Sequence, residues 1–240
     1  MFQGEGAAHD RQPAYLLRTA PPDEPQPPAL EWLTWGPALG HDDVLCRAWD
    51  RASGMGLGKQ RERFVVHGIR TLSAAGAVAH TEALWPAPQT NAWTLDEAVW
   101  PLPGSPASTP CRLRFAAPLR LIRQRTLVLQ PTLPDVVAAC IRGLRLAVPA
   151  AEAQALLDLC ATEALQAAAR VPAEAWQGSR ATFHRYSARQ DCEIDHDGVT
   201  GSIDLPNGPG AMWPLLLVGV WLHLGKTTVH GLGQMTVEPL

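Results

Sequence analysis

The chain has 240 residues, a formal net charge of −3 and 46% hydrophobic residues. This length fits one large domain or two small ones, and the apolar content is ample for packed cores. The composition shows no overall basic excess of the kind that marks many nucleic-acid-binding proteins. The five cysteines are scattered without a Cys-x-x-Cys pair, so neither a zinc ribbon nor a disulfide framework is indicated.

The N-terminus lacks a basic segment followed by an apolar one, as a secretion signal would have. The longest apolar run, 215–224, is too short to span a membrane. We therefore expect a soluble cytoplasmic protein.

The first half reads as strands around one helix. Asp42 and Asp43 favour a helix N-terminus, and apolar residues follow them at helical spacing. Beyond a glycine-rich loop, the segment RFVVHGI is rich in β-branched residues, which favours a strand. In chain order, the expected elements are strands at 14–18 and 30–35, a helix from 40 to 54 and a strand at 63–69.

A domain boundary is predicted in the uncharged segment PLPGSPASTP, 101–110, because proline, serine and glycine suit a linker. The domains would then be 1–104 and 105–240. The second contains a helical insertion at about 150–180, and without it the order is β-α-β-β-α-β, the α+β ferredoxin-like arrangement. Its expected elements are strands at 112–115 and 126–130, helices at 134–146 and 150–170, hairpin strands at 181–189 and 199–205 joined by an acidic loop through 197–198, an apolar helix and a final strand.

The tail from 213 to 237, WPLLLVGVWLHLGKTTVHGLGQMTV, holds a glycine-rich turn between a helix and a strand. Such glycines let backbone amides approach a phosphate, and Lys226 and His230 can add charge beside it. A nucleotide-binding P-loop is the alternative. Gly219 leaves five residues before Gly225, however, where that motif needs four, and a P-loop follows a strand and opens a helix. The tail is therefore predicted to be a phosphate-facing loop without nucleotide hydrolysis.

Five motifs follow one another along the chain: YLLRTAPP at 15–22, Gly-x-Gly-x-x-Arg at 56–61, FAAPLRLI at 115–122, RYSARQ at 185–190 and HLGKTTVHGLGQ at 223–234. In this order they resemble the CRISPR precursor-RNA-processing endoribonucleases of the RAMP superfamily, whose signature is the last of these segments, the glycine-rich loop. The short length, the helical insertion and the lack of a Tyr-His-Lys set around the first helix point to a diverged subtype, such as a type IV member.

The resemblance implies two tandem ferredoxin-like (RRM-like) domains that bind the stem-loop of CRISPR repeat RNA. It also implies that they cut it at the base of the stem, without metal or cofactor, and hold the mature guide RNA, with other effector subunits as further partners. In such cleavage the ribose 2′-hydroxyl attacks the adjacent phosphate, so a base, an acid and cations are useful. The products would be a cyclic phosphate and a 5′-hydroxyl. The alternative is a non-catalytic RNA-binding RAMP subunit of an effector complex.

Many family members carry a histidine on the first helix of the first domain, and His41 stands at the start of that helix. The resemblance makes it the leading catalytic candidate; a capping or solvated histidine is the alternative. Arg47, Arg51 and Arg18 are the arginine candidates for orienting RNA and stabilising charge. Surface helix cations are the alternative for Arg47 and Arg51.

The RNA-binding candidates lie on the glycine-rich loops, the hairpin and the basic segment. Tyr186 could stack on a base, with a buried ring as the alternative, and His223 is predicted to be a core residue. The full set is Arg185, Tyr186, Arg189, Gly225, Lys226, His230, Gly231, Gly233, Lys59, Arg61, Arg120 and Arg123.

Overall fold

The computed structural model describes residues 15–19, 30–35, 40–72, 78–82, 100–148, 151–187 and 190–240. The chain divides into two compact units. The first consists of Met1–Gly36, Pro101–Phe183 and Asp197–Leu240; the second of Pro37–Trp100 and His184–His196. The division at residues 104 and 105 that the sequence suggests stays a prediction.

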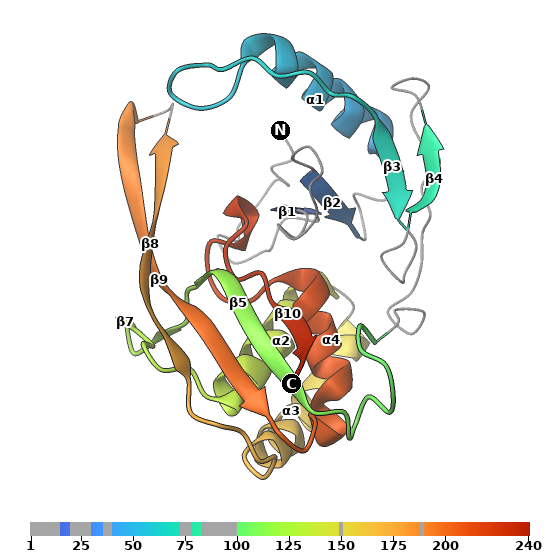
Figure 1. Cartoon of the computed structure of the whole chain (residues 1–240), viewed down its shortest axis with the longest axis vertical. Helices are drawn as coiled ribbons and strands as arrows, with labels where there is room; N and C mark the ends of the chain where they lie inside the picture. Colours follow the sequence, from blue (N-terminus) through green and yellow to red (C-terminus); the bar gives the residue numbers. More distant parts are fainter. Residues whose placement is uncertain are drawn as a thin grey trace. The chain divides into compact units, whose positions relative to one another are not determined.

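The first unit is built on a four-stranded sheet in the order β10-β5-β9-β8 (Figure 1). Its strands are β5 (Cys111–Leu119), β8 (Gln177–Ser187), β9 (Cys192–Leu205) and β10 (Thr236–Pro239). Together with α2 (Leu133–Ala147) and α4 (Trp213–Leu222), the chain order is β-α-β-β-α-β. The strand order is therefore fourth, first, third, second, and the predicted α+β ferredoxin-like arrangement of this part of the chain is confirmed.

The sheet has one covered face, because apolar and polar residues alternate along β5. Cys111, Leu113 and Phe115 are buried, whereas Arg112 and Arg114 lie on the opposite face. The two helices α2 and α4 pack against each other and lie behind the sheet in Figure 1.

Helix α2 is fixed at its start by a capping box, in which Thr132 and Asp135 bond reciprocally to each other's backbone amides. Its packing against α4 is close: a Cβ on Gly219 of α4 would lie 2.9 Å from the Cys140 sulfur. This contact therefore requires glycine, the residue without a Cβ, at position 219.

The inserted helix α3 (Ala151–Ala168) packs on α2. Gln154 donates to the Val148 carbonyl at 2.6 Å, and Arg145 pairs with Asp158. The helical part of the insertion ends earlier than predicted, because β8 already begins at Gln177.

The β8–β9 hairpin is longer than the sequence suggested. Residues 192–198 were expected to include an acidic loop, but they belong to β9, and the hairpin turns at about 190–191. The reason is that the acids have partners on the facing strand: Asp197 accepts hydrogen bonds from Arg180 and Thr182 at 2.6 and 2.9 Å. Gly178 and Gly201 also let the strands approach, since a Cβ on Gly178 would lie 2.1 Å from the Thr200 carbonyl oxygen.

Two further elements differ from the expectation around the basic segment. The strand expected at 126–130 is reduced to β7 (Thr126–Leu127), which forms a small hairpin with β6 (Ile122–Arg123). Its turn uses Gln124 and Arg125 with φ of 48° and 65°, a geometry that usually selects glycine or asparagine. No turn signal was therefore available in the sequence.

In the second unit, α1 (Asp42–Met55) begins as predicted, with Asp42 and Asp43 in its first turn. It ends at Met55, and the glycine that follows it is Gly56, not the expected Gly54. Gly56 has φ of 80°, and a Cβ there would lie 2.1 Å from the Arg61 carbonyl oxygen, so it is this glycine that the chain reversal requires. The ring of Trp49 on α1 meets Phe64 edge-on at 6.0 Å between centroids.

The strand predicted at 63–69 is wrong: residues 63–68 are not in a strand. Strand β3 (Ile69–Leu72) starts where that segment ends and pairs with β4 (Val78–Glu82). Val65 is 74% exposed, so β-branched residues alone did not make a strand without a neighbouring surface to cover them.

The remaining described strands are β1 (Tyr15–Thr19) and β2 (Leu30–Thr34), an antiparallel pair in the first unit. The strands predicted at 14–18 and 30–35 correspond to them within one residue at each end. Two short 3-10 turns, η3 (Gly210–Met212) and η4 (Thr228–His230), flank α4. Among the described helices, no segment combines the length and the apolar character that crossing a bilayer requires.

One ion pair ties the two central strands together on the open face of the sheet. Arg112 donates through Nε and Nη2 to the two oxygens of Asp204, at 2.6 and 2.7 Å, and Asp204 is only 8% exposed. The hydrogen bonds from Arg112 hold the pKa of Asp204 below its ordinary value. Such a lowered pKa adds stability above the pKa of the unfolded chain, and that stability is lost as pH falls through the folded value.

We therefore expect Asp204→Asn to lower the melting temperature at pH 7 and to flatten its decline between pH 5 and about 3. Thermal unfolding followed by circular dichroism over this pH range measures both effects. Asp158→Asn is the matched control, because that carboxylate is 68% exposed and surface pairs contribute little. Equal pH profiles for the wild type and Asp204→Asn would contradict the assignment.

Candidate nucleic-acid interface

The glycine-rich loop, residues 223–234, is fastened to the end of β5 by backbone contacts. The amide of Lys226 donates to the Arg120 carbonyl at 2.9 Å, and that of Gly233 donates to the Pro118 carbonyl at 3.0 Å. The loop also closes on itself, since Leu224 N–H donates to the Gly233 carbonyl at 2.9 Å. These bonds fix the course of the loop without using any side chain.

Two glycines of this loop are required by distance. A Cβ on Gly225 would lie 2.5 Å from the Arg120 carbonyl oxygen, and one on Gly233 would lie 1.8 Å from that of Leu224. Both also have positive φ, 92° and 74°. The close approach at Gly225 is to the residue after β5, and that at Gly233 is to Leu224 within the loop itself. Approach of these glycines to a phosphate stays a prediction.

The loop presents its cations outward. Lys226 and His230 are exposed, whereas His223 is buried, as predicted for a core histidine. At Gly231 there is room for a Cβ, since the nearest atom, the Leu17 carbonyl oxygen, would be 3.8 Å away. Glycine is favoured there by its backbone conformation, with φ of 81°. An exposed lysine and histidine on a rigid loop can hold a phosphate by charge.

Strand β1 contacts the turn η4 of the same loop. This strand carries Arg18, whose backbone pairs with Glu31. The structure therefore brings the strand of one catalytic candidate against the loop that carries His230. The Arg18 side chain lies outside what the structure describes.

Two predicted RNA-binding arginines have partners within the protein. Arg120 donates to the Asp197 carbonyl at 3.0 Å, which links the end of β5 to β9. Arg123 pairs with Asp135, the capping residue of α2. Both hold the scaffold around the loop, and their remaining guanidinium donors are available to a ligand.

The outer part of the hairpin and the loop after α1 form a second cluster, within the second unit. Lys59 Nζ lies 5.9 Å above the centre of the Tyr186 ring, an arrangement that attracts the cation to the ring face. The Tyr186 hydroxyl donates to Asp191, and this hydrogen bond raises the pKa of Tyr186. The nearby charge of Arg61 acts in the opposite direction. Tyr186 is partly exposed, so the alternative of a buried ring is wrong.

The hairpin also holds a pair that the sequence reasoning missed. His184 Nδ1 lies 2.7 Å from Asp195 Oδ1, across the two strands, and both side chains are exposed. The signal was present as an alternation of polar residues in both strands, but the predicted acidic loop left Asp195 without a strand partner. Arg185, beside it on β8, is half-buried, and Arg189 lies outside the described residues.

Helix α1 of the same unit carries the other catalytic candidates. His41 is the residue at its N-cap position and is exposed, and its side chain makes no capping hydrogen bond. The capping alternative is therefore wrong. Arg47 and Arg51 are four residues apart and share one side of the helix, where Arg47 pairs with Asp43.

The predicted residues thus fall into two groups. Gly225, Lys226, His230, Gly231 and Gly233, with Arg120 and Arg123, belong to the first unit; Lys59, Arg61, Arg185 and Tyr186, with His41, Arg47 and Arg51, belong to the second.

In the described parts of the chain, no three His, Cys, Asp or Glu side chains gather closely enough to hold a metal ion. All five cysteines are free. Burial raises the pKa of the Cys111 thiol to about 11 and that of Cys140 to about 12, so both thiols stay protonated and act as small apolar residues.

A known protein family matches the part of the chain that carries the glycine-rich loop. The family described as CRISPR-associated endoribonuclease Cas6 matches residues 113–235, which is more than half of the chain. The match includes strands β8 and β9, most of β5 and the glycine-rich loop. The chain belongs to the Cas6 family. It is therefore a CRISPR-associated, RNA-cleaving enzyme of the type that the sequence resemblance implied.

No curated protein matches the chain. Among solved structures, a Cas6 substrate mimic complex is 17% identical, covering 94% of this chain and 85% of that one, with a TM-score of 0.45. A Cas6 product complex is 14% identical, covering 95% and 81%, with a TM-score of 0.47. A Thermus thermophilus Cas6 is 14% identical over 56% of this chain and 55% of that one, with a TM-score of 0.37. At these TM-scores the likenesses carry no further argument.

The contacts of Gly233 lead to a stability prediction. An alanine there would place Cβ 1.8 Å from the Leu224 carbonyl oxygen, at φ of 74°, so Gly233→Ala should unfold the loop anchor and cost about 3 kcal/mol or more. Gly58→Ala is the matched control, because Gly58 also has φ of 74° but no atom lies within 4 Å of its Cβ position. It should cost only about 1–2 kcal/mol.

Urea unfolding followed by fluorescence compares the two Cas6 variants. Equal free energies of unfolding would mean that Gly233 does not approach Leu224 within the loop as closely as described.

Proposed function

We propose that this Cas6-family chain cleaves CRISPR repeat RNA at the base of its stem-loop by attack of the 2′-hydroxyl, without a metal, and then holds the product. The observation that carries the proposal is the glycine-rich loop. Its backbone is fixed to β5, and its cations Lys226 and His230 face outward. A rigid loop of this kind holds a phosphate at a set position because little ordering remains to be done when RNA binds.

The cluster on the hairpin supports RNA contact at a second place. Lys59 and Arg61 supply cations, and Tyr186 offers a partly exposed ring on which a base can stack. The hydrogen bond to Asp191 raises the pKa of Tyr186. At neutral pH the phenol therefore stays protonated and serves binding, not proton abstraction.

For the chemistry, we propose His41 as the general acid or base and Arg47 and Arg51, on the same helix, as the cations that orient RNA and stabilise the phosphorane. Arg18, on β1 of the first unit, is a further arginine candidate for orienting RNA. Histidine suits this work because its ordinary pKa lies near neutrality. His41 is exposed at the start of α1, where a substrate can reach it. Attack by the 2′-hydroxyl would release a 5′-hydroxyl and leave a 2′,3′-cyclic phosphate, so protons must be taken up and given at two oxygens.

The second candidate function is a non-catalytic RNA-binding subunit. It is favoured by Arg120 and Arg123, which are engaged in ion pairs and hydrogen bonds of the scaffold and so stiffen a binding surface. Both functions need the same loop; only one needs His41 and the α1 arginines.

We expect the purified chain to cut its repeat RNA once in the presence of EDTA and to leave a cyclic phosphate end. Gel analysis of end-labelled RNA, before and after acid treatment to open the cyclic phosphate, measures this. A need for magnesium would overturn the metal-free reaction. Tight binding of pre-cut RNA with no cleavage under any condition would favour the non-catalytic subunit.

We also expect His41→Ala to slow single-turnover cleavage by about 100-fold or more, the usual contribution of one acid or base. RNA affinity should change little, so that the loss falls on the chemical step. His67→Ala is the matched control, because His67 is an exposed histidine of the same unit outside the proposed site. Unchanged cleavage by His41→Ala would move the chemistry to the arginines, which Arg47→Ala and Arg51→Ala then test.

A further inference from the structure

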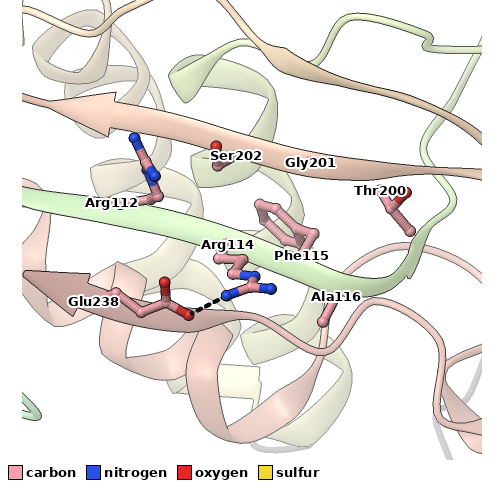
Figure 2. A pocket seen from close by; sticks show the side chains of 8 residues that line it. All are labelled: Arg112, Arg114, Phe115, Ala116, Thr200, Gly201, Ser202 and Glu238. Carbon is pink, nitrogen blue, oxygen red and sulfur yellow. Dashed lines mark hydrogen bonds and ion pairs between the residues drawn. The ribbon is translucent and has the colours of Figure 1, made fainter. Parts of the chain in front are cut away.

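An open pocket of about 390 Å³ lies on the face of the sheet that carries Arg112 and Arg114, in the size range of small-ligand sites (Figure 2). Strands β5, β9 and β10 of the first unit line it. None of its residues belongs to the interface proposed above. The lining consists of Arg112, Arg114, Phe115, Ala116, Thr200, Gly201, Ser202 and Glu238.

Two ion pairs on this face differ in how completely they are closed. Arg112 and Asp204 share two hydrogen bonds of 2.6 and 2.7 Å, and Asp204 is buried. Arg114 and Glu238 meet through a single contact of 3.5 Å, and their side chains are 56% and 37% exposed. A contact of that length is at the outer limit of a hydrogen bond. The first pair therefore holds the strands, and the second remains open to a ligand.

The open pair leaves donors and acceptors unused beside each other. Glu238 Oε1 receives both Arg114 Nη1 and the Thr236 hydroxyl, whereas Oε2 has no contact in the part of the chain that the structure describes. Arg114 uses only Nη1 there. Figure 2 shows the two side chains pointing toward one another from β5 and β10.

Small side chains lie beside this pair. Ala116 follows Arg114 on the same face of β5, and Ser202 lies directly opposite Arg114 in the strand register. A flat ligand can therefore reach the Arg114–Glu238 pair without displacing a large residue. Ser202 and Thr200 add hydroxyls that donate or accept.

The charges of the open pair offset one another, so a neutral ligand with its own donors and acceptor fits better than a phosphate. Among RNA bases, guanine alone presents two parallel N–H donors, at N1 and N2, next to the acceptor O6. A carboxylate accepts such paired donors, and an arginine donates to O6. Adenine and cytosine present one amino group beside a ring acceptor, and uracil presents one N–H between two acceptors.

We propose that this pocket binds an unpaired guanine of the RNA, with Glu238 accepting from N1–H and N2–H and Arg114 donating to O6. The base must be unpaired because these atoms form its Watson–Crick edge. The proposal rests on the proposed function for RNA as the ligand. It adds a base-specific contact to an interface whose other contacts are to phosphate or by stacking.

The test is fluorescence anisotropy of the full chain with labelled RNA hexamers UUUGUU, UUUAUU and UUUIUU, where I is inosine. We expect the guanine hexamer to bind about tenfold more tightly than the adenine one, the range of a bidentate base contact. Inosine lacks the N2 amino group and should fall between them. Glu238→Gln should abolish the preference for guanine, and the control Asp158→Asn, which removes the same charge from the exposed pair on α3, should keep it.

Equal affinity for the three hexamers, or an unchanged preference in Glu238→Gln, would overturn the proposal. Equal affinities that all fall in Arg114→Ala would identify a phosphate contact and would also overturn it. Circular dichroism melts of Glu238→Gln confirm the fold, since this residue stands near the end of β10. Cleavage in EDTA is a separate readout. Discrimination of guanine without cleavage would support the guanine site and refute the proposed reaction. Cleavage without discrimination would support the reaction and refute the guanine site.

Discussion

The close approach between the glycine-rich loop and the end of β5 is the constraint on which the interface depends. Backbone bonds run from Lys226 and Gly233 to the carbonyls of Arg120 and Pro118. A Cβ at Gly225 would strike the Arg120 carbonyl, and one at Gly233 would strike that of Leu224 within the loop. The loop's course is thus set by its backbone. Lys226 and His230 are exposed on it, where a phosphate can be bound.

Several arginines of the basic segment are engaged by partners within the protein. Seven arginines and a single acid lie between residues 111 and 149, which reads in the sequence as a broad basic surface. In the folded chain, Arg112 is closed onto Asp204, Arg120 onto the Asp197 carbonyl, and Arg123 onto Asp135. Asp204 and Glu238, both remote in sequence, face Arg112 and Arg114, whereas Arg123 meets the segment's own Asp135 and Arg120 meets a backbone carbonyl. What remains for a ligand is decided by how completely each pair is closed, as the contrast between Arg112 and Arg114 shows.

The sequence predicted best where local signals and long-range packing agree. Helix α2 was predicted to within one residue, because Thr132, Pro134 and Asp135 mark its start and one apolar side packs on α4. It failed where partners decide the outcome. Residues 63–68 have strand-forming composition but are not in a strand. Residues 192–198 look like an acidic loop but belong to β9, where Asp197 accepts hydrogen bonds from Arg180 and Thr182. Charge and β-propensity are properties of a single residue, whereas strand pairing also depends on which segment lies beside it in the folded chain.

The sequence by itself determined the order of elements in the ferredoxin-like part and the glycine-rich loop, because hydrophobic periodicity and glycine spacing are local properties. It also contained the motifs by which the Cas6 family is recognised. Tertiary structure alone decided which cations stay available, that Lys59 meets Tyr186, and that Arg114 and Glu238 share a pocket. These residues are more than a hundred positions apart, and only the folded sheet and hairpin bring them within the few ångströms at which charges and hydrogen bonds act.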